Sequence, residues 1–259
     1  TKPTVLLGIS GSIAAYKAVL VARLLLKAGV RVIPVMTSAA TKMVGPATLA
    51  GICGEPVHVE MFSRGAAGEL HVELGAMADV VALVPATADL LAGLAGGRAN
   101  DLLRATAMCA AGTIAVAPAM HPRMWSNRAT QRNVAWLAAD PRYRFIGPVD
   151  GEVASGEQGV GRMAEPEAIA AEILALLGSR DWAGLRLVVS AGPTVEDLDP
   201  ARVLSNRSSG KMGYAIAARA AARGAVVTLV SGPTALPTPH GCRRVDVRSA
   251  LDMQAALGI

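Results

Sequence analysis

Short apolar runs alternate with glycine-containing polar loops and with segments of helical periodicity along the first 178 residues. A unit of strand, loop and helix recurs about five times, which is typical of a doubly wound parallel sheet buried on both faces. We therefore expect a flavodoxin-like α/β fold, in which ligands bind beyond the C-terminal ends of the strands. The expected strands are residues 5–8, 30–36, 80–84, 113–117 and 144–146. The expected helices are residues 14–26, 41–51, 71–79, 90–96, 129–139 and 165–177.

A second, shorter pattern of the same kind follows. Residues 147–163 are rich in glycine and poor in apolar side chains, so we expect a flexible flap outside the core. Expected strands at residues 185–190, 225–230 and 243–247, with helices between and after them, indicate an incomplete Rossmann-like domain. The predicted organisation is a first domain at residues 1–178, a linker at 179–184 and a partial second domain at 185–259.

Composition and charge narrow the class of protein. With 52% hydrophobic and 17% charged residues, the chain has ample apolar surface for buried parallel strands and for an oligomer interface. No apolar run reaches the roughly 18 to 20 residues that span a bilayer, so we expect no membrane association and no secretion signal. The net charge is +5, but no basic block is interleaved with aromatic residues, which argues against nucleic acid as a partner.

The cysteines favour a reducing compartment. Cys53, Cys109 and Cys242 are widely spaced and form no CxxC pair, so a cytoplasmic location and no metal site are expected. We expect Cys53 and Cys109 to be buried as small apolar residues.

The most informative stretch is the loop between the first strand and the first helix. A loop of this kind exposes backbone N–H groups at the positive end of a helix, where a phosphate is favoured. Glycine permits the close approach that a Cβ would block. A tight turn without a ligand remains the alternative. The residues in this candidate phosphate loop are Gly8, Ser10, Gly11, Ser12 and Ile13.

The loops after the other strands indicate which phosphate-containing cofactor is favoured. A dinucleotide-binding domain places an acid after the second strand, but here Met36 is followed by the hydroxyl residues Thr37 and Ser38. This argues against NAD and favours FMN. Further candidate cofactor contacts follow the third and fourth strands, at Pro85, Ala86, Thr87, Ala88, Ala119 and Met120.

Several motifs together resemble one known family across essentially the whole chain. The first half carries GISGSIAAYK, a histidine at a helix start (His71), PATAD, PAMHPRMW and GEQGVGRM. The second half carries AGPTVEDLDPARVLSNRSSGKMGYAIA and LVSGPTALPTP. The sequence resembles the bifunctional coenzyme A biosynthesis proteins, in which phosphopantothenoylcysteine decarboxylase is joined to phosphopantothenate–cysteine ligase. Because that family continues past residue 259, we expect the ligase half to be truncated and inactive.

For the first half, the resemblance implies FMN-dependent decarboxylation of 4′-phospho-N-pantothenoylcysteine to 4′-phosphopantetheine. It implies that His71 is the catalytic base, although a lone histidine at a helix start is more often a cap or a surface residue. By the same resemblance, His121 occupies the position of the family's asparagine, which holds the substrate carboxylate. Ser155 occupies the position of the family's cysteine, which donates a proton. The resemblance also implies cofactor contact by Thr106 and substrate contacts by Met124, Gly159, Gly161, Arg162 and Met163.

For the second half, the resemblance implies ligation of 4′-phosphopantothenate with cysteine, driven by CTP with Mg²⁺. The residues it implicates are Gly192, Pro193, Thr194, Asn206, Ser208, Ser209, Gly210 and Lys211. For any one of them a helix cap or turn is an adequate alternative explanation. The resemblance further implies a homo-oligomer built from trimers, up to a dodecamer.

Three alternatives remain open. The changes at His121 and Ser155 allow a flavin-binding regulatory or scaffold homologue without decarboxylase activity. A flavin-utilising prenyltransferase or peptidyl-cysteine decarboxylase shares the first half, but the attached ligase half argues against it. A nicotinamide-dependent dehydrogenase is the least favoured, because the acid after the second strand is missing.

Overall fold

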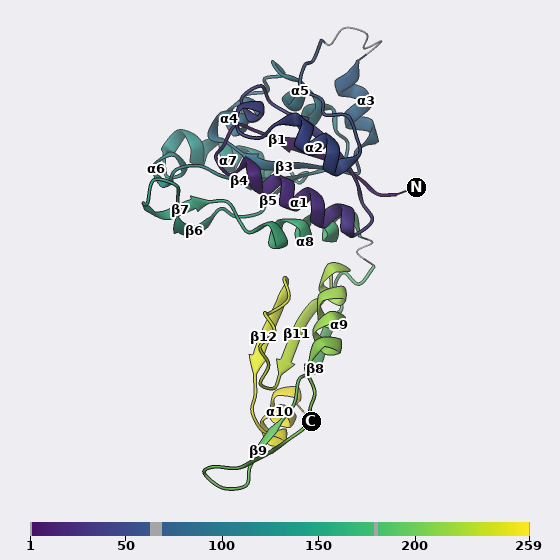
Figure 1. The fold of residues 1–259 in the computed structure, drawn as a ribbon, viewed down its shortest axis with the longest axis vertical. Helices are drawn as coiled ribbons and strands as arrows, with labels where there is room; N and C mark the ends of the chain where they lie inside the picture. Colours follow the sequence, from purple (N-terminus) through teal and green to yellow (C-terminus); the bar gives the residue numbers. More distant parts are fainter. Residues whose placement is uncertain (1, 63–68, 179–180, 259) are drawn as a thin grey trace. The chain divides into compact units, whose positions relative to one another are not determined.

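The chain forms two compact units, residues Thr1–Leu177 and Gly178–Ile259, in a computed structural model that describes residues 2–62, 69–178 and 181–258 (Figure 1). Ser179 and Arg180 of the expected linker lie outside the described residues. No helix in those described ranges is long and apolar enough to cross a membrane.

The first unit is built on a five-stranded parallel sheet of order β2-β1-β3-β4-β5, which is the flavodoxin-like order. The strands are β1 (Thr4–Ile9), β2 (Arg31–Met36), β3 (Val80–Ala86), β4 (Thr113–Pro118) and β5 (Tyr143–Phe145). A hairpin of β6 (Val149–Glu152) and β7 (Gln158–Arg162) follows. We call this hairpin and its turn the flap.

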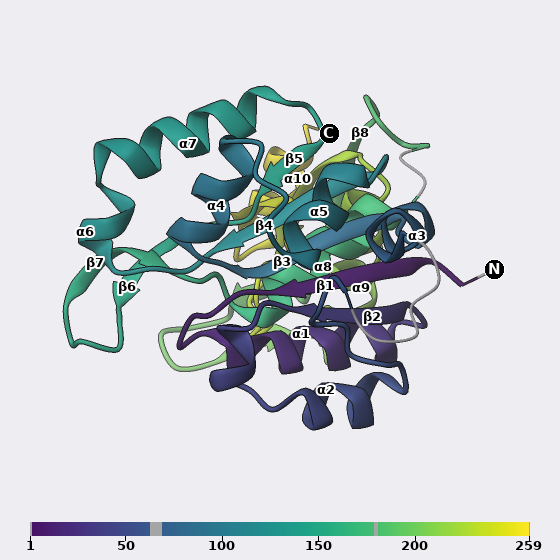
Figure 2. The same cartoon turned by 90° about the horizontal axis from the view of Figure 1, so that it is seen from above.

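Helices cover both faces of this sheet (Figure 2). Alternate side chains of β1 enter two separate cores, with Val5, Leu7 and Ile9 in one and Leu6 in the other. The first core is closed by α1 (Ala15–Lys27), α2 (Pro46–Cys53) and α8 (Pro166–Leu177). The second core is closed by α3 (Leu70–Met77), α4 (Ala88–Ala95), α5 (Leu102–Cys109) and α7 (Arg128–Ala139). The first unit also contains two short helices, η1 (Ala40–Lys42) and α6 (Pro122–Trp125).

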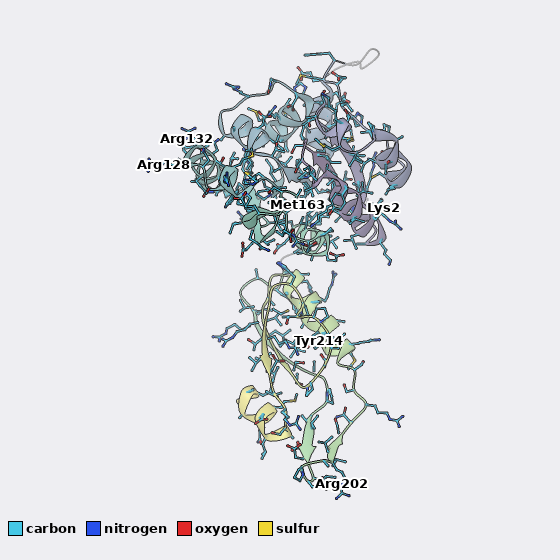
Figure 3. All side chains as sticks on the ribbon, turned by 60° about the vertical axis from the view of Figure 1, so that its left-hand side comes forward. Lys2, Arg128, Arg132, Met163, Arg202 and Tyr214 are labelled. Carbon is cyan, nitrogen blue, oxygen red and sulfur yellow. The ribbon has the colours of Figure 1, made fainter. Side chains whose placement is uncertain are left out.

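Four details differ from the sequence-based expectation. The helix expected at residues 41–51 is split into η1 and α2, since Gly45 is extended and Pro46 starts a new helix. Helix α5 was not anticipated, because its polar Arg104 and Thr106 are buried and mask the apolar pattern. Met163, at the end of the expected flap, packs in the first core (Figure 3). Cys109 is exposed, so its expected burial was wrong, and Cys53 is half-buried.

The second unit is a three-stranded parallel sheet of order β12-β11-β8. Its core lies under α9, where Tyr214, Ala217 and Ala220 pack against Val227 and Leu229 of β11. A short antiparallel pair, β9 and β10, precedes α9. The elements are β8 (Arg186–Ala191), β9 (Val195–Asp197), β10 (Val203–Ser205), α9 (Lys211–Ala222), β11 (Val226–Ser231), β12 (Cys242–Asp246) and α10 (Ala250–Leu257).

Candidate functional site

A cavity of about 510 Å³ lies beyond the C-terminal ends of strands β1 to β4. Loops far apart in the sequence meet there because the carboxyl ends of parallel strands share one edge of a sheet. Its size is within the range usual for a cofactor site. The lining residues are Ser10, Gly11, Ser12, Thr37, Ser38, Ala39, Thr87, Ala88, Asp89, Leu90, Asp101, Arg104, Ala119, Met120 and Met124.

The loop after β1 presents unused backbone donors to this cavity. The N–H groups of Gly11 and Ile13 have no acceptor among the described residues, and both precede the first turn of α1. That turn contains no acidic residue to offset the positive end of the helix. The Ser12 hydroxyl accepts from the Ala14 N–H at 3.3 Å, which leaves its proton free to donate. This loop therefore has the chemistry of an anion site.

Ser10 is a bridge between two of the loops. It is buried, and its hydroxyl donates to the Pro85 carbonyl at 2.7 Å and accepts from the Thr87 N–H at 3.0 Å. Both of these interactions tie the end of β1 to the end of β3. Its side chain thus fixes the shape of the cavity wall.

The loop after β2 closes tightly over the first loop. A Cβ on Gly11 would lie 2.5 Å from the Ala39 Cβ, so glycine is required for this contact. Thr37 Oγ1 accepts from the N–H of Ala40, the first residue of η1, at 3.2 Å. The N–H groups of Ser38 and Ala39 have no acceptor among the described residues.

Charged groups at the β3 side of the cavity were missed by the sequence analysis. Arg104 of α5 is buried and pairs with the carboxylates of Asp89 and Asp101. It also donates to the Asp89 carbonyl at 2.9 Å and to Asn100 Oδ1 at 3.3 Å. Gly93 of α4 makes room for it, because a Cβ there would clash with the guanidinium. A basic residue in an otherwise apolar helix was the signal available in the sequence.

His121 is engaged at both ring nitrogens. Its Nδ1 accepts from the Arg123 N–H at 3.2 Å as the cap of α6, and its Nε2 lies 2.8 Å from Glu157 Oε2. Glu157 belongs to the flap, and its Oε1 also accepts a hydrogen bond from Arg123 Nε at 3.1 Å. The sequence analysis did not single out Glu157, whose role depends on the folding of the flap onto α6.

The flap glycines allow close packing. A Cβ on Gly161 would clash with the Met120 carbonyl, and one on Gly159 would lie 3.0 Å from Pro122 Cβ. The Met120 N–H donates to the Gly161 carbonyl at 3.0 Å. The flap is therefore held against the segment that carries Met120, which lines the cavity.

His121, Gly159 and Gly161 lie outside the cavity lining, and so do the remaining predicted residues of the first unit. Gly8 is in β1, where a Cβ would clash with Leu103. Thr106 is fully buried, and its hydroxyl has no partner in the part of the chain that the structure describes. Arg162 pairs with Glu165, and Met163 is in the core. The others are Ile13, which is 68% exposed, Pro85 and Ala86 at the end of β3, and Ser155, exposed in the flap turn.

His71 is not brought to the cavity within one chain. It lies in the first turn of α3, which packs against α5. In both Figure 1 and Figure 2, α3 and α6 are at opposite ends of the first unit. His71 and His121 of one chain are therefore far apart.

A second cavity, of about 400 Å³, lies at the start of α9 in the second unit. Of the predicted ligase residues, the structure brings Gly192, Ser208, Ser209, Gly210 and Lys211 together in its lining. Gly192 and Gly210 both have positive φ, at 79° and 74°, and the Thr234 methyl group lies beside both.

The other three predicted residues of this unit support the loops around the cavity. Asn206 Oδ1 accepts from the Ser208 N–H at 2.9 Å, which shapes the approach to α9. The Thr194 carbonyl accepts from the Ser205 hydroxyl at 2.8 Å. Pro193 packs so closely on Gly232 that no Cβ fits there.

Comparison with known proteins agrees with this architecture. Residues 1–178 match the family model described as flavoprotein. The chain belongs to the flavoprotein family. Residues 182–258 of this flavoprotein match a second model, described as the DNA/pantothenate metabolism flavoprotein C-terminal domain.

Individual relatives confirm the resemblance inferred from the motifs. The chain is 45% identical, over 98% of its length, to the coenzyme A biosynthesis bifunctional protein CoaBC of Vibrio cholerae. It spans 63% of that relative's length.

Solved structures confirm the fold of the first unit. A mutant PPC decarboxylase complexed with pantothenoylaminoethenethiol is 30% identical with a TM-score of 0.60, covering 67% of this chain and 97% of that one. The FMN binding protein AtHal3 is also 30% identical, with a TM-score of 0.57, covering 67% of this chain and 95% of that one. The predicted flavodoxin-like fold is thus correct.

Proposed function

We propose that the first unit binds FMN and decarboxylates 4′-phospho-N-pantothenoylcysteine to 4′-phosphopantetheine in coenzyme A biosynthesis. The observation that carries this proposal is the cavity of about 510 Å³ with unused N–H groups of Gly11 and Ile13 at the start of α1. Membership of the flavoprotein family and similarity to an FMN binding protein support the choice of cofactor.

The residues present fit FMN. The Gly11–Ser12 loop and the Ser38 N–H would hold its phosphate, and the absence of an acid after β2 suits a ribityl chain better than a closed ribose. When bound, the flavin supplies reversible oxidation of the substrate thiol, which makes loss of the neighbouring carboxylate as CO₂ possible. The protein supplies binding, orientation and proton transfer.

We assign the substrate carboxylate to the group formed by His121 and Arg123. In the structure the carboxylate of Glu157 already bridges the His121 Nε2 and the Arg123 guanidinium. A substrate carboxylate would bind the same donors, so the flap must release them when substrate enters. Met124, which follows Arg123 in α6, lines the cavity. Ser155 in the flap turn is our candidate proton donor, although a serine hydroxyl is a weaker acid than a thiol.

We propose His71 as the base, acting in the cavity of a second copy of the chain. The separation of α3 from α6 supports this, because one chain does not supply both histidines to one cavity. The protein would accordingly be a homo-oligomer built from trimers, up to a dodecamer. A histidine has the proton affinity required of a base near neutral pH.

We also propose that the second unit contributes to the ligation of 4′-phosphopantothenate with cysteine, with CTP and Mg²⁺. Its cavity at the start of α9 offers the Ser208 and Ser209 hydroxyls and the Lys211 ammonium to phosphate groups. A cytoplasmic location completes the proposal, consistent with three free cysteines.

One experiment tests the decarboxylase. The purified chain is expected to be yellow and to convert 4′-phospho-N-pantothenoylcysteine to CO₂ and 4′-phosphopantetheine, followed by mass spectrometry. A His71→Asn variant should keep the flavin spectrum and lose turnover. A yellow protein with no turnover would support the flavin-binding homologue, and a colourless protein that takes up no FMN would refute the proposal.

A further inference from the structure

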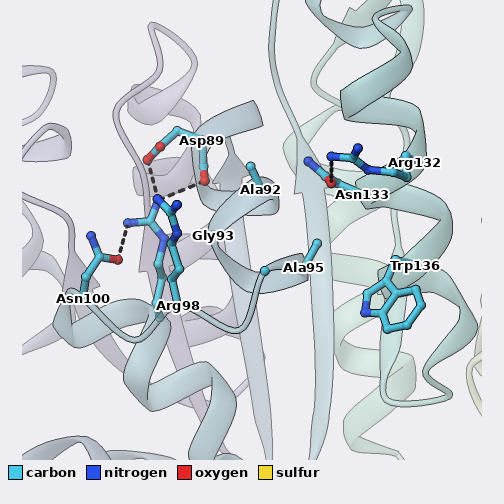
Figure 4. A pocket seen from close by; sticks show the side chains of 11 residues that line it. Asp89, Ala92, Gly93, Ala95, Arg98, Asn100, Arg132, Asn133 and Trp136 are labelled. Atoms are coloured by element: carbon cyan, nitrogen blue, oxygen red, sulfur yellow. Dashed lines mark hydrogen bonds and ion pairs between the residues drawn. The ribbon is translucent and has the colours of Figure 1, made fainter.

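A second cavity of the first unit, of about 470 Å³, lies between the α4–α5 connection and α7 (Figure 4). We call it the arginine cleft. It shares only Asp89 and Arg104 with the flavin cavity, so these two side chains form the wall between them. The lining residues are Asp89, Ala92, Gly93, Ala95, Gly96, Arg98, Asn100, Arg104, Arg132, Asn133 and Trp136.

The charges of the cleft are unbalanced toward positive. Three arginines line it, with Asp89 as the single carboxylate, and Asp89 is already paired with Arg104. Within the described ranges, Arg98 and Arg132 form no ion pair, and Arg132 donates only to Asn133 Oδ1 at 3.4 Å. Two guanidinium groups without carboxylate partners therefore face one cleft, from opposite walls. Planar guanidinium groups are suited to bidentate binding of phosphate.

An aromatic side chain stands beside these charges. Trp136 is 71% exposed, although a tryptophan usually gains by burial. It is one helical turn from Arg132 on α7 and projects from the same wall of the cleft (Figure 4). An exposed indole can stack on a planar base, as aromatic side chains do in single-strand nucleic-acid sites. The amide side chains of Asn100 and Asn133 add donors and acceptors able to contact a ribose or base edge.

The buried guanidinium gives the cleft a fixed floor. Arg104 is 6% exposed and is held by Asp89, Asp101 and Asn100, so its position does not depend on a ligand. Its Nε is buried without a hydrogen-bond partner among the described residues. The more exposed Arg98 and Arg132 are left to engage a ligand directly.

We propose that the arginine cleft binds a nucleoside diphosphate or triphosphate, separately from the flavin. The phosphate groups lie between Arg98 and Arg132, and the base stacks on Trp136. A volume of about 470 Å³ is sufficient for a mononucleotide. This site goes beyond the proposed decarboxylase and does not depend on it.

The test is calorimetric titration of the whole chain with ADP, with inorganic pyrophosphate and with adenosine. Saturable binding of ADP is expected, weakened at least tenfold by Arg98→Ala or Arg132→Ala. Trp136→Ala is expected to weaken ADP but to leave pyrophosphate unchanged. Arg128→Ala is the matched control, because Arg128 starts the same helix and is outside the cleft lining (Figure 3).

Two further arms locate the binding. Saturating FMN should leave the affinity for ADP unchanged, and Lys211→Ala, at the cavity of the second unit, should do the same. The proposal is overturned if ADP does not bind, if FMN or Lys211→Ala abolishes binding, or if Arg98→Ala and Arg132→Ala have no effect. It is also overturned if the arginine variants change the size of the oligomer in sedimentation but not ADP affinity. Melting curves identify any variant that fails to fold.

Discussion

At the scale of single residues, side chains predicted to contact the cofactor or the substrate also hold the loops of the site in place. Ser10 looked like a phosphate donor in the sequence, but its hydroxyl joins the Pro85 carbonyl and the Thr87 N–H. His121 has both ring nitrogens engaged by Arg123 and Glu157. Which partner a polar side chain chooses depends on loops distant in the chain, so the motifs alone could not give it.

Ser10→Ala is expected to destabilise the fold by roughly 1–3 kcal/mol, because it removes a buried hydroxyl that bonds the Pro85 carbonyl and leaves the half-buried Thr87 N–H without its acceptor. Urea unfolding followed by circular dichroism measures this. The control is Ser126→Ala, since Ser126 is exposed and its hydroxyl makes one hydrogen bond of 3.4 Å, and it should change stability by less than about 0.5 kcal/mol. Equal effects of the two variants would contradict the bridging role of Ser10.

The Cys53 thiol is expected to be unreactive. Burial, with a smaller contribution from the nearby Glu55 carboxylate, raises its pKa to about 11. The folded state therefore favours the neutral thiol, and at pH 8 its alkylation by iodoacetamide should be roughly 100-fold slower than that of a free cysteine. Peptide mass spectrometry over time gives the rate, with urea-unfolded protein as the control. Fast labelling in the folded protein would show that the site is open to solvent.

At the scale of elements, the flap is positioned by contacts with segments distant in the chain, which the local sequence of the flap does not predict. Its glycines predicted flexibility, yet β6 and β7 pair and β7 packs on the segment after β4. Its base continues into Met163, which is in the core. Close to Met163 in the sequence, the Glu165 carboxylate forms ion pairs with Lys17 of α1 and Arg162 of β7. One carboxylate therefore connects α1, the flap and the start of α8.

Gly161→Ala should displace the flap, because the added Cβ would clash with the Met120 carbonyl. Decarboxylation is expected to fall at least tenfold while the flavin spectrum persists, since the phosphate loop is untouched. Gly156→Ala is the matched control in the flap, because a Cβ at that position meets no atom within 4 Å and so causes no clash. Its positive φ adds some backbone strain. Unchanged turnover in Gly161→Ala would separate the flap from catalysis.

The Glu165 contacts make stability depend on pH. Lys17 above all, with Arg162, holds the pKa of Glu165 below its usual value. The carboxylate therefore stabilises the fold above the unfolded pKa near 4.5, and this contribution is lost as the pH falls through the lower folded value. Melting temperatures of the wild type and Glu165→Gln should converge as the pH falls from 6 to 3. A constant difference across that range would contradict the linkage.

At the scale of the whole molecule, the proposed chemistry requires more than one chain. His121 caps α6, whose Met124 lines the cavity, whereas His71 is on α3 at the other end of the first unit. The high apolar content is consistent with an additional subunit interface, but the sequence does not specify which surfaces meet.

Co-expression of two inactive variants tests the shared site. His71→Asn lacks the proposed base, and Gly11→Asp should lose the flavin, because its Cβ meets Ala39 and its carboxylate repels a phosphate. Mixed oligomers should regain part of the decarboxylase activity, since some cavities would combine an intact loop with an intact His71. No recovery in purified mixed oligomers would show that each chain uses its own His71.

The fold class and the family could be predicted from the sequence, because they follow from periodicity and from motifs that are contiguous in the chain, and the loop after β1 was predicted in the same way as a phosphate site. The sequence also indicated FMN, through the hydroxyl residues after β2. Four features became visible in the folded chain alone: the buried Arg104 with its two aspartates, the contact of His121 with Glu157, the distance of His71 from α6, and the arginine cleft. These depend on side chains from separate elements that meet in space, and a linear pattern does not contain the geometry of those meetings.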